Sequence, residues 1–376
     1  MKSLLSFELY KIYRQKSIYI AIILLLGLIT LSLNSQSASN RSSYYKEWEG
    51  EVTADKYEQA VAANSALMKK WESEGTPLTE EERAMSGVYE KLSVLYRLEV
   101  QRQESVASVT EQLNAMKENG EKGYELRKTS TTLRMLEDYK IDKMYYNRAP
   151  AEMIDFVNTF ATLISGVLIL IGLSSIFSNE YATGMDQFQL SSKYGRKQVV
   201  TAKIIASIIY VISIVGAWVL YNFIFRISVY GGGGWQTPLQ EVFKYRVSPY
   251  GYNLGTYIMV QIGMHLLGAL GLGLIVLLIS ALCRHTLLSF LISGFIFAMP
   301  IAVRSIFDLP LPWLNKLLEF SFTDVMRVEE LFITFQTINF FGLPVSYPSV
   351  AISVTIALSA VSVYLLYHTM KRKEAF

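Results

Sequence analysis

The sequence predicts an all-α, polytopic membrane protein in which six transmembrane helices carry an extracytoplasmic helical-hairpin domain with coiled-coil-like character. The first observation is composition, because 51% of the 376 residues are hydrophobic and only 18% are charged. The second is the charge distribution. Residues 34–155 are acidic, with 17 Lys+Arg and 22 Asp+Glu, whereas the rest of the chain is basic, with 18 Lys+Arg and 10 Asp+Glu. The third is a series of apolar runs of about 20 residues, the length that a helix needs to cross a bilayer. A basic membrane portion beside an acidic insert fits membrane orientation and argues against nucleic-acid binding.

The first 34 residues predict a short surface helix followed by the first span. Residues 1–16 contain four basic residues, and Leu5, Leu9 and Ile12 share one helical stripe. We therefore expect a cytoplasmic interfacial helix over residues 1–16 and a first span over residues 17–34. A secretory signal peptide is the alternative, because a basic end precedes an apolar run and small residues follow it.

Residues 35–150 predict a helical domain outside the membrane. Apolar residues recur at three-four spacing from residue 57 to residue 71, which indicates an amphipathic helix. A second helix is expected to start after Thr79, because Thr79 and Glu82 form the signature of a capping box. Its apolar seam continues to residue 116, and a third helix returns toward the membrane, so the pattern favours antiparallel hairpins.

The length of the second helix predicts the shape of this domain. A continuous helix over residues 78–118 would measure about 60 Å at 1.5 Å per residue. We expect it to project outward as a narrow stalk. Glu99 and Arg102, which interrupt its apolar seam, would then lie far from the membrane.

The rest of the chain alternates between apolar runs and polar connections. The expected order is a second span (151–177), a cytoplasmic loop (178–203), a third span (204–225), an extracytoplasmic loop (226–253), a fourth span (254–282), a fifth span (286–303), extracytoplasmic or re-entrant helices (304–347), a sixth span (348–368) and a cytoplasmic tail (369–376). Four consecutive glycines occupy residues 231–234, but no Gly-Lys-Ser/Thr follows them there or elsewhere, so the sequence holds no phosphate loop. Cys283 is the single cysteine, so an intrachain disulfide is excluded.

The loop over residues 178–203 is the stretch around which the membrane portion is organised. It is polar and basic, and its lysines and arginine place it in the cytoplasm. Met185, Phe188 and Gln189 would share one side of a short helix between Gly184 and Gly195. Such a helix could dock a soluble partner, although a plain connector between two spans can have the same composition.

The same loop carries a resemblance to a known family. The runs EYATG at residues 180–184 and GRKQ at residues 195–198 resemble the first cytoplasmic loop of ABC-2-type exporter permeases, and the basic segment before the first span is similar as well. In that family the loop is a coupling helix that fits a groove on a separate ATPase subunit. The resemblance therefore implies coupling roles for a set of loop residues: Glu180, Gly184, Met185, Phe188, Arg196 and Lys197.

Ionisable residues inside spans are costly to bury and therefore point to function. His265, near the middle of the fourth span, is the best candidate and could line a substrate path. The alternative is a neutral imidazole bonded to a neighbouring helix. Arg304 and Asp308 are spaced for a local ion pair at the outer end of the fifth span. The spacing of His, Cys, Asp and Glu predicts no catalytic or metal site.

The resemblance implies a permease subunit of an ATP-driven exporter in a bacterial plasma membrane, with both termini in the cytoplasm. We expect no ATPase site and no cofactor in this chain, because ATP and magnesium would be bound by the partner ATPase. The expected partners are cytosolic ABC ATPase subunits, a second copy or a sister permease, and membrane lipid. A peptide, an antibiotic or another amphipathic molecule would be the substrate, in bacteriocin export or drug resistance.

Three other functions remain open at this point. One is a membrane-embedded enzyme that uses His265, which would need partner acids or nucleophiles nearby. An ATP-independent secondary transporter would be expected to show interrupted spans and buried carboxylates in both halves. A membrane sensor would use the helical domain as a receptor and the spans as an anchor.

Overall fold

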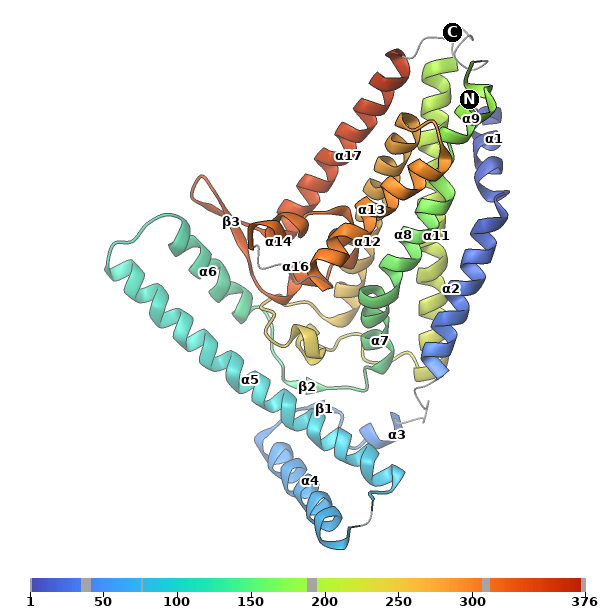
Figure 1. Ribbon diagram of the computed structural model, residues 1–376. Coiled ribbons are helices and arrows are strands. Elements are labelled where there is room, and N and C mark those ends of the chain that lie inside the picture. The colour runs from blue at the N-terminus through green and yellow to red at the C-terminus, as the bar shows by residue number, and fades with distance from the viewer. Residues whose placement is uncertain (1, 35–41, 76, 188–194, 306–311, 373–376) are drawn as a thin grey trace.

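The computed structural model describes residues 2–34, 42–75, 77–187, 195–305 and 312–372. These residues are almost wholly helical, and their strands form two small antiparallel pairs. Five of the described helices are long and apolar enough to cross a membrane, which confirms the all-α, polytopic fold class. Both termini lie at one end of the helix bundle, and the domain formed by residues 42–147 lies at the other end (Figure 1).

The bundle is built around α12 (Leu254–Leu282). This helix contacts α8 (Thr162–Leu173), α11 (Gly195–Tyr230), α13 (Thr286–Ser305) and α17 (Tyr347–Arg372). At one edge of the bundle lies α2 (Lys16–Asn34), whose 19 residues span about 28 Å (Figure 1). It packs against α8 and follows α1 (Lys2–Tyr13).

Small residues set how closely the helices of the bundle approach one another. A Cβ added at Gly166 would lie 2.1 Å from the ring of Phe297, and one at Gly172 would lie 2.5 Å from the ring of Tyr210. Both rings therefore sit where a side chain would otherwise be, and the pairs α8–α13 and α8–α11 come together around them. In a membrane, where lipid is as apolar as leucine, such close packing supplies much of the helix association.

The second span contains a break in helical geometry that the sequence did not reveal. Between α7 (Arg148–Phe156) and α8, the segment η1 (Val157–Ala161) is a π-helix. A π turn shifts the backbone hydrogen bonds by one residue and leaves a carbonyl available. The side-chain amide of Gln261 donates to the carbonyl of Ile154 at 3.3 Å, just before this turn.

In the described part of the domain between the first two spans, the three helices of 14 or more residues match those that the apolar periodicity predicts. They are α4 (Ala54–Glu74), α5 (Glu80–Glu118) and α6 (Tyr124–Glu137), preceded by the short α3 (Ser42–Tyr45) and joined to α7 through the strand pair β1 (Gly50–Glu51) and β2 (Lys143–Met144). The capping box is confirmed: the Thr79 hydroxyl accepts from the backbone of Glu82, whose carboxylate accepts from the backbone of Thr79. A small core around Val88, Leu92 and Leu95 holds α5 to α4 and to the residues before α7.

The expectation of an outward stalk is wrong. Figure 1 shows α5 running obliquely across the end of the bundle, with α6 folded back along it. Lys91 of α5 is 2.9 Å from Glu241 in the connection between α11 and α12, and the hydroxyl of Tyr124 bonds Thr337. Arg102, expected far out on a stalk, donates to Glu99 and to the carbonyl of Leu136 within the domain. These lateral contacts could not be read from periodicity, which gives a helix length but no direction.

Residues 312–346 combine short helices with a hairpin. The helices are α14 (Pro312–Leu318), α15 (Phe322–Arg327) and α16 (Glu330–Ile333). The hairpin pairs β3 (Thr337–Phe340) with β4 (Leu343–Ser346), whereas helices alone were expected over residues 304–347. Phe341 and Gly342 form the turn, with positive φ angles of 51° and 84°, a geometry that a helix cannot accommodate.

Two short 3₁₀ segments complete the connection between α11 and α12 at the end of the bundle beside the helical domain, which we call the outer end (Figure 1). They are η2 (Leu239–Glu241) and η3 (Phe243–Tyr245). Of the preceding glycines, Gly234 has a packing role, because a Cβ there would lie 2.4 Å from the Cα of Asn147. This loop can therefore lie directly against the end of the helical domain.

Candidate functional site

The loop between the second and third spans lies at the end of the bundle that carries both termini (Figure 1). Its first helix is α9 (Ser178–Thr183), which ends at Gly184 with a left-handed φ of 70°. Residues 185–187 are helical again, and α11 begins at Gly195. Met185 is 48% exposed, and Lys197 is also exposed. Phe188 and the Arg196 side chain fall outside the described residues.

Glu180, for which the family resemblance implies a coupling role, points into the protein and is 6% exposed. Its carboxylate accepts hydrogen bonds from Lys203 at 2.7 Å and from Lys11. Lys203 also donates to Glu8 at 3.1 Å and to the carbonyl of Ile176 at 3.2 Å. The side chains of Lys203, Glu8 and Glu180 are 0%, 3% and 8% exposed. Two acids and two bases thus form a cluster that is buried except at Lys11, whose side chain is 34% exposed. We call it the four-charge cluster: Glu8, Lys11, Glu180 and Lys203.

The four-charge cluster joins three separate parts of the chain. Glu8 and Lys11 come from the first helix, Glu180 from α9 and Lys203 from the first turns of α11. Although burial disfavours its charge, the hydrogen bond and attraction from Glu180, with a further contribution from Glu8, raise the pKa of Lys11. Buried charges persist only when they are paired in this way, so the cluster fixes the positions of α1, α9 and α11 relative to one another.

A hollow of about 490 Å³ opens beside the four-charge cluster, between α1 and α9. Its lining includes Phe7 and Tyr10 from α1, Arg14 from the turn after α1 and Asn179 from α9. Phe7 and Tyr10 are 51% and 55% exposed. With these exposed rings and the cation Arg14, this end of the bundle has a surface that a folded soluble domain could cover.

His265 is fully buried at the centre of the bundle. One ring nitrogen lies 2.7 Å from the carbonyl of Met326 in α15, and the other lies 2.9 Å from the hydroxyl of Ser165 in α8. The indole of Trp218 meets the ring edge-on and donates to the same hydroxyl at 3.1 Å. The imidazole therefore links α12 to α8, α11 and α15, as in the alternative of a satisfied structural histidine. The ion pair predicted between Arg304 and Asp308 lies outside the described residues, which include neither the Arg304 side chain nor Asp308.

A second polar network lies between His265 and the outer end of the bundle. Gln261 donates to Asn158 at 2.7 Å, Asn158 donates to the hydroxyl of Tyr245 at 3.3 Å, and the hydroxyl of Tyr257 donates to Tyr245 at 2.7 Å. Asn158 lies within the π-helix. The irregular turn of the second span is thus tied by buried hydrogen bonds to the outer loop that carries Tyr245.

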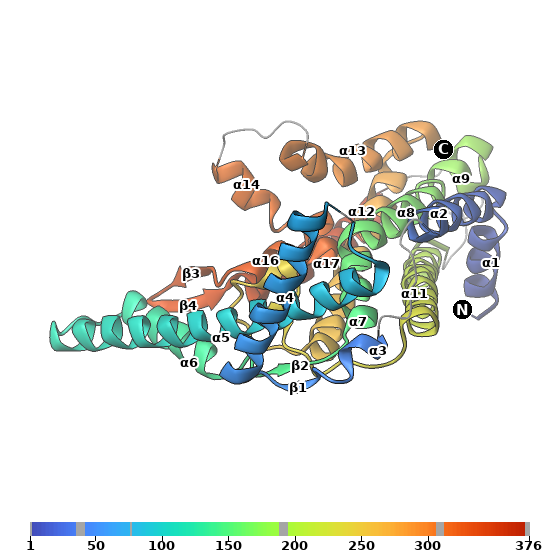
Figure 2. The same ribbon diagram turned by 90° about the horizontal axis from the view of Figure 1, so that it is seen from below.

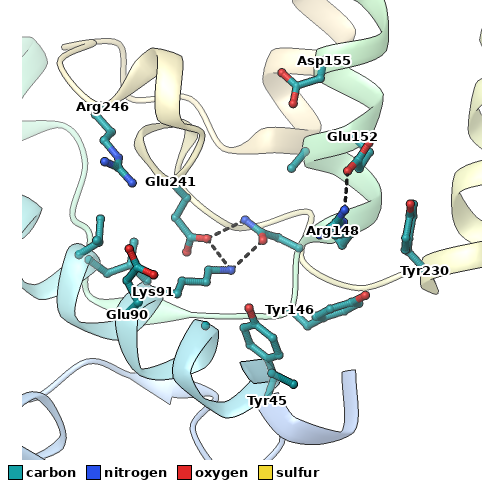
Figure 3. Close-up of a pocket in the computed structure, with 16 residues that line it drawn as sticks. Tyr45, Glu90, Lys91, Tyr146, Arg148, Glu152, Asp155, Tyr230, Glu241 and Arg246 are labelled. Atoms are coloured by element: carbon teal, nitrogen blue, oxygen red, sulfur yellow. Dashed lines mark hydrogen bonds and ion pairs between the residues drawn. The ribbon is translucent and has the colours of Figure 1, made fainter. Parts of the chain in front are cut away.

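A cavity of about 630 Å³ separates the helical domain from the bundle (Figure 3). Its lining mixes charge with tyrosine rings, and the chargeable and aromatic members are Tyr45, Glu90, Lys91, Tyr146, Arg148, Glu152, Asp155, Tyr230, Glu241 and Arg246. These residues come from α3, α5, the entrance to α7, the end of α11 and the loop before α12. We call this cavity the outer pocket.

Two lining residues of the outer pocket, Lys91 and Glu241, form an ion pair. The ammonium of Lys91 lies 2.9 Å from the carboxylate of Glu241 and 2.7 Å from the side-chain oxygen of Asn147, as the dashed lines in Figure 3 show. Burial raises the pKa of Glu241, and the attraction of Lys91 opposes that rise. One Glu241 oxygen and the Nε of Arg246 have no hydrogen-bond partner among the described residues.

Neither the four-charge cluster nor the outer pocket was predicted from the sequence. Glu8 and Lys11 lie in the segment before the first span, Glu180 begins the EYATG run and Lys203 ends the loop, so the four residues were visible in the sequence although their pairing was not. The outer pocket had no such signal, because its charges look like ordinary solvated residues of a loop and of two helices.

Comparison with known families gives one match. A family model described as ABC-2 family transporter protein matches residues 3–340. No curated protein matches the chain. The matched region includes α1, the loop of Glu180, the helical domain between the first two spans and the first five predicted spans.

Proposed function

The chain belongs to the ABC-2 transporter family, and on that basis we propose that it is the permease subunit of an exporter driven by a separate ABC ATPase. As a multi-pass membrane protein of this family, it would work with ATPase subunits that bind ATP and magnesium. It would supply the path through the membrane together with a second copy or a sister permease.

The proposal orients the four-charge cluster toward the cytoplasm. Lys2, Lys11, Arg14 and Lys16 belong to the same end of the bundle as Lys197, and Lys371 and Arg372 end α17 there. The acidic helical domain lies at the opposite end. Cytoplasmic connections of membrane proteins carry an excess of lysine and arginine, so this distribution supports cytoplasmic termini and an extracytoplasmic domain.

The single observation that carries the coupling mechanism is the buried four-charge cluster. A loop that transmits force must be rigidly attached to the spans, and Glu180 ties α9 to both α1 and α11. Glu180 would therefore hold the loop in place from within, while Met185 and Lys197 would face the ATPase. Movement of the ATPase dimer would then shift α1, α9 and α11 as one body.

The outer pocket supports an amphipathic substrate. Its tyrosine rings and its opposed charges suit a molecule with apolar and polar groups, such as a peptide or an antibiotic. It lies where a molecule leaving the bundle would meet the helical domain. We propose that this domain captures or gates the substrate at the exit.

Co-purification with the ATPase tests the proposal. A tagged chain isolated from its native membrane should carry a soluble protein with a P-loop, and Met185→Asp should reduce the recovery of that protein, because a charge would replace an apolar contact. Val247→Asp is the matched control, since Val247 is also exposed but belongs to the outer loop. Equal ATPase recovery in both variants would show that the contact lies elsewhere, and absence of any P-loop partner would contradict the function.

A further inference from the structure

An apolar groove lies between α2, α8 and α11, within the membrane-spanning part of the chain. It encloses about 340 Å³. Its lining comes from the α1–α2 region, α7, α8 and α11 and consists of Tyr13, Ile18, Tyr19, Ile22, Leu25, Leu26, Phe156, Ile164, Leu168, Tyr210, Ser213, Ile214, Ala217, Trp218 and Tyr221. In Figure 2, which looks along the bundle, α2 and α11 flank α8, and α2 meets the bundle mainly through α8.

The polar atoms of the groove wall are largely used within the protein. The hydroxyl of Tyr13 bonds that of Ser213 at 2.7 Å, and the hydroxyl of Tyr210 donates to the carbonyl of Leu168 at 2.8 Å. The indole nitrogen of Trp218 donates to Ser165. What remains for a ligand is hydrocarbon and ring surface. A cavity with such a lining holds water poorly and favours an apolar occupant.

The surroundings of the groove indicate which apolar molecule reaches it. The outer side of α2 exposes Ile20, Ile23 and Leu24 at 58%, 69% and 62%, as expected of a helix that faces lipid. Tyr13 lies at one end of the groove and is followed by two exposed cations, Arg14 and Lys16. A basic cluster at the end of a hydrophobic slot complements a molecule with an anionic head and a hydrocarbon tail.

We propose that the groove binds one acyl chain of an anionic phospholipid, whose phosphate lies near Arg14 and Lys16. The bilayer supplies this occupant at high local concentration. A bound chain would fill the space between α2 and α11 and would contact Trp218, which donates to the hydroxyl that also meets His265. Lipid occupancy would thereby support the contact between the first helices and the bundle. The proposal does not depend on transport activity or on an ATPase.

Trp218 provides the test, because it lines the groove and is only 4% exposed. A variant that keeps Trp218 and replaces the other four tryptophans with phenylalanine is reconstituted into vesicles containing phosphatidylglycerol or phosphatidylcholine with brominated acyl chains. Bromine quenches tryptophan fluorescence on contact. We expect strong quenching of Trp218, and stronger quenching by brominated phosphatidylglycerol than by brominated phosphatidylcholine.

Two further variants connect the quenching to the groove. Ala217→Phe, which fills the groove, should abolish most of the quenching, whereas Ile212→Phe should retain it, because Ile212 is exposed on the same helix outside the lining. The double variant Arg14→Gln/Lys16→Gln should lose the preference for phosphatidylglycerol.

A second measurement covers the case in which the single-tryptophan variant does not fold. Phospholipid retained by the otherwise unaltered protein after detergent exchange is quantified by mass spectrometry, and Ala217→Phe should retain less of it than Ile212→Phe. Trp218 that is unquenched in both lipids would overturn the proposal. So would equal quenching, or equal lipid retention, in the two phenylalanine variants. Disulfide cross-linking between two copies through Tyr19→Cys, combined with unquenched Trp218, would assign the groove to a second chain instead.

Discussion

Removing Lys203 should be far more damaging than removing Lys11, although both lysines bind the same glutamates. Lys203 is fully buried, so Lys203→Met would leave the carboxylates of Glu8 and Glu180 with Lys11 alone. Breaking a buried ion pair by removing one partner costs about 3–5 kcal/mol. Lys11 is 34% exposed, so water can replace part of its interaction, and Lys11→Met should cost on the order of 1 kcal/mol.

A double variant separates the charge from the loss of packing. Lys203→Met combined with Glu180→Gln leaves the neutral pair Glu8 and Lys11, so it should be more stable than the single Lys203→Met variant. Thermal unfolding in detergent can be followed with a thiol-reactive dye, because Cys283 is buried and is the only cysteine. Equal losses for Lys203→Met and Lys11→Met, or strictly additive losses in the double variant, would refute the argument that burial makes the cluster strong.

Three further predictions concern the buried His265 at the centre of the bundle, the ion pair of the outer pocket and the close packing of α8 against α13. His265→Ala should lower the free energy of unfolding by about 1–3 kcal/mol, because its two buried partners lose a hydrogen bond, and His265→Gln should recover part of that loss. If transport per folded molecule falls while stability is unchanged, a role in the substrate path is favoured instead. The pKa of Glu241 is raised in the folded protein, so Glu241 costs stability as pH rises above about 4.3, its value in the unfolded chain. Lys91→Met removes the opposing charge, so its loss of thermal stability should be larger at about pH 8 than at about pH 5, whereas a pH-independent loss would contradict this. Gly166→Ala should destabilise by about 1–3 kcal/mol through overpacking against Phe297, while Gly216→Ala, in open space, should be neutral; similar melting temperatures for both would contradict the packing argument.

The sequence predicted what depends on local pattern. The apolar runs indicated the spans, and the Thr79–Glu82 signature gave the start of α5, because a capping box is formed by residues three positions apart. The family was recognised from short motifs in the loop after the second span. Each of these features can be read within a window of a few residues to about twenty.

The features that it missed depend on contacts between distant parts of the chain. Glu8 and Lys203 are 195 positions apart, and Lys91 and Glu241 are 150 apart, so neither pairing has a local signal. The direction of α5 follows from Lys91 and Tyr124, whose partners lie in the outer loops. The hairpin of residues 337–346 was missed because its apolar strands resemble a short buried helix, and its turn is visible only through Asn339 and Gly342.

The most direct test of the account is the side of the membrane on which the loop and the helical domain lie. In a Cys283→Ser background, a single cysteine is introduced at Met185 or at Ser108, both of which are exposed, whereas Ser93 is too buried to serve. Intact cells are treated with a membrane-impermeant thiol reagent. We predict that Ser108→Cys is labelled in intact cells and that Met185→Cys is labelled only after the cells are opened. The opposite pattern would put the helical domain in the cytoplasm and contradict docking of an ATPase at Met185.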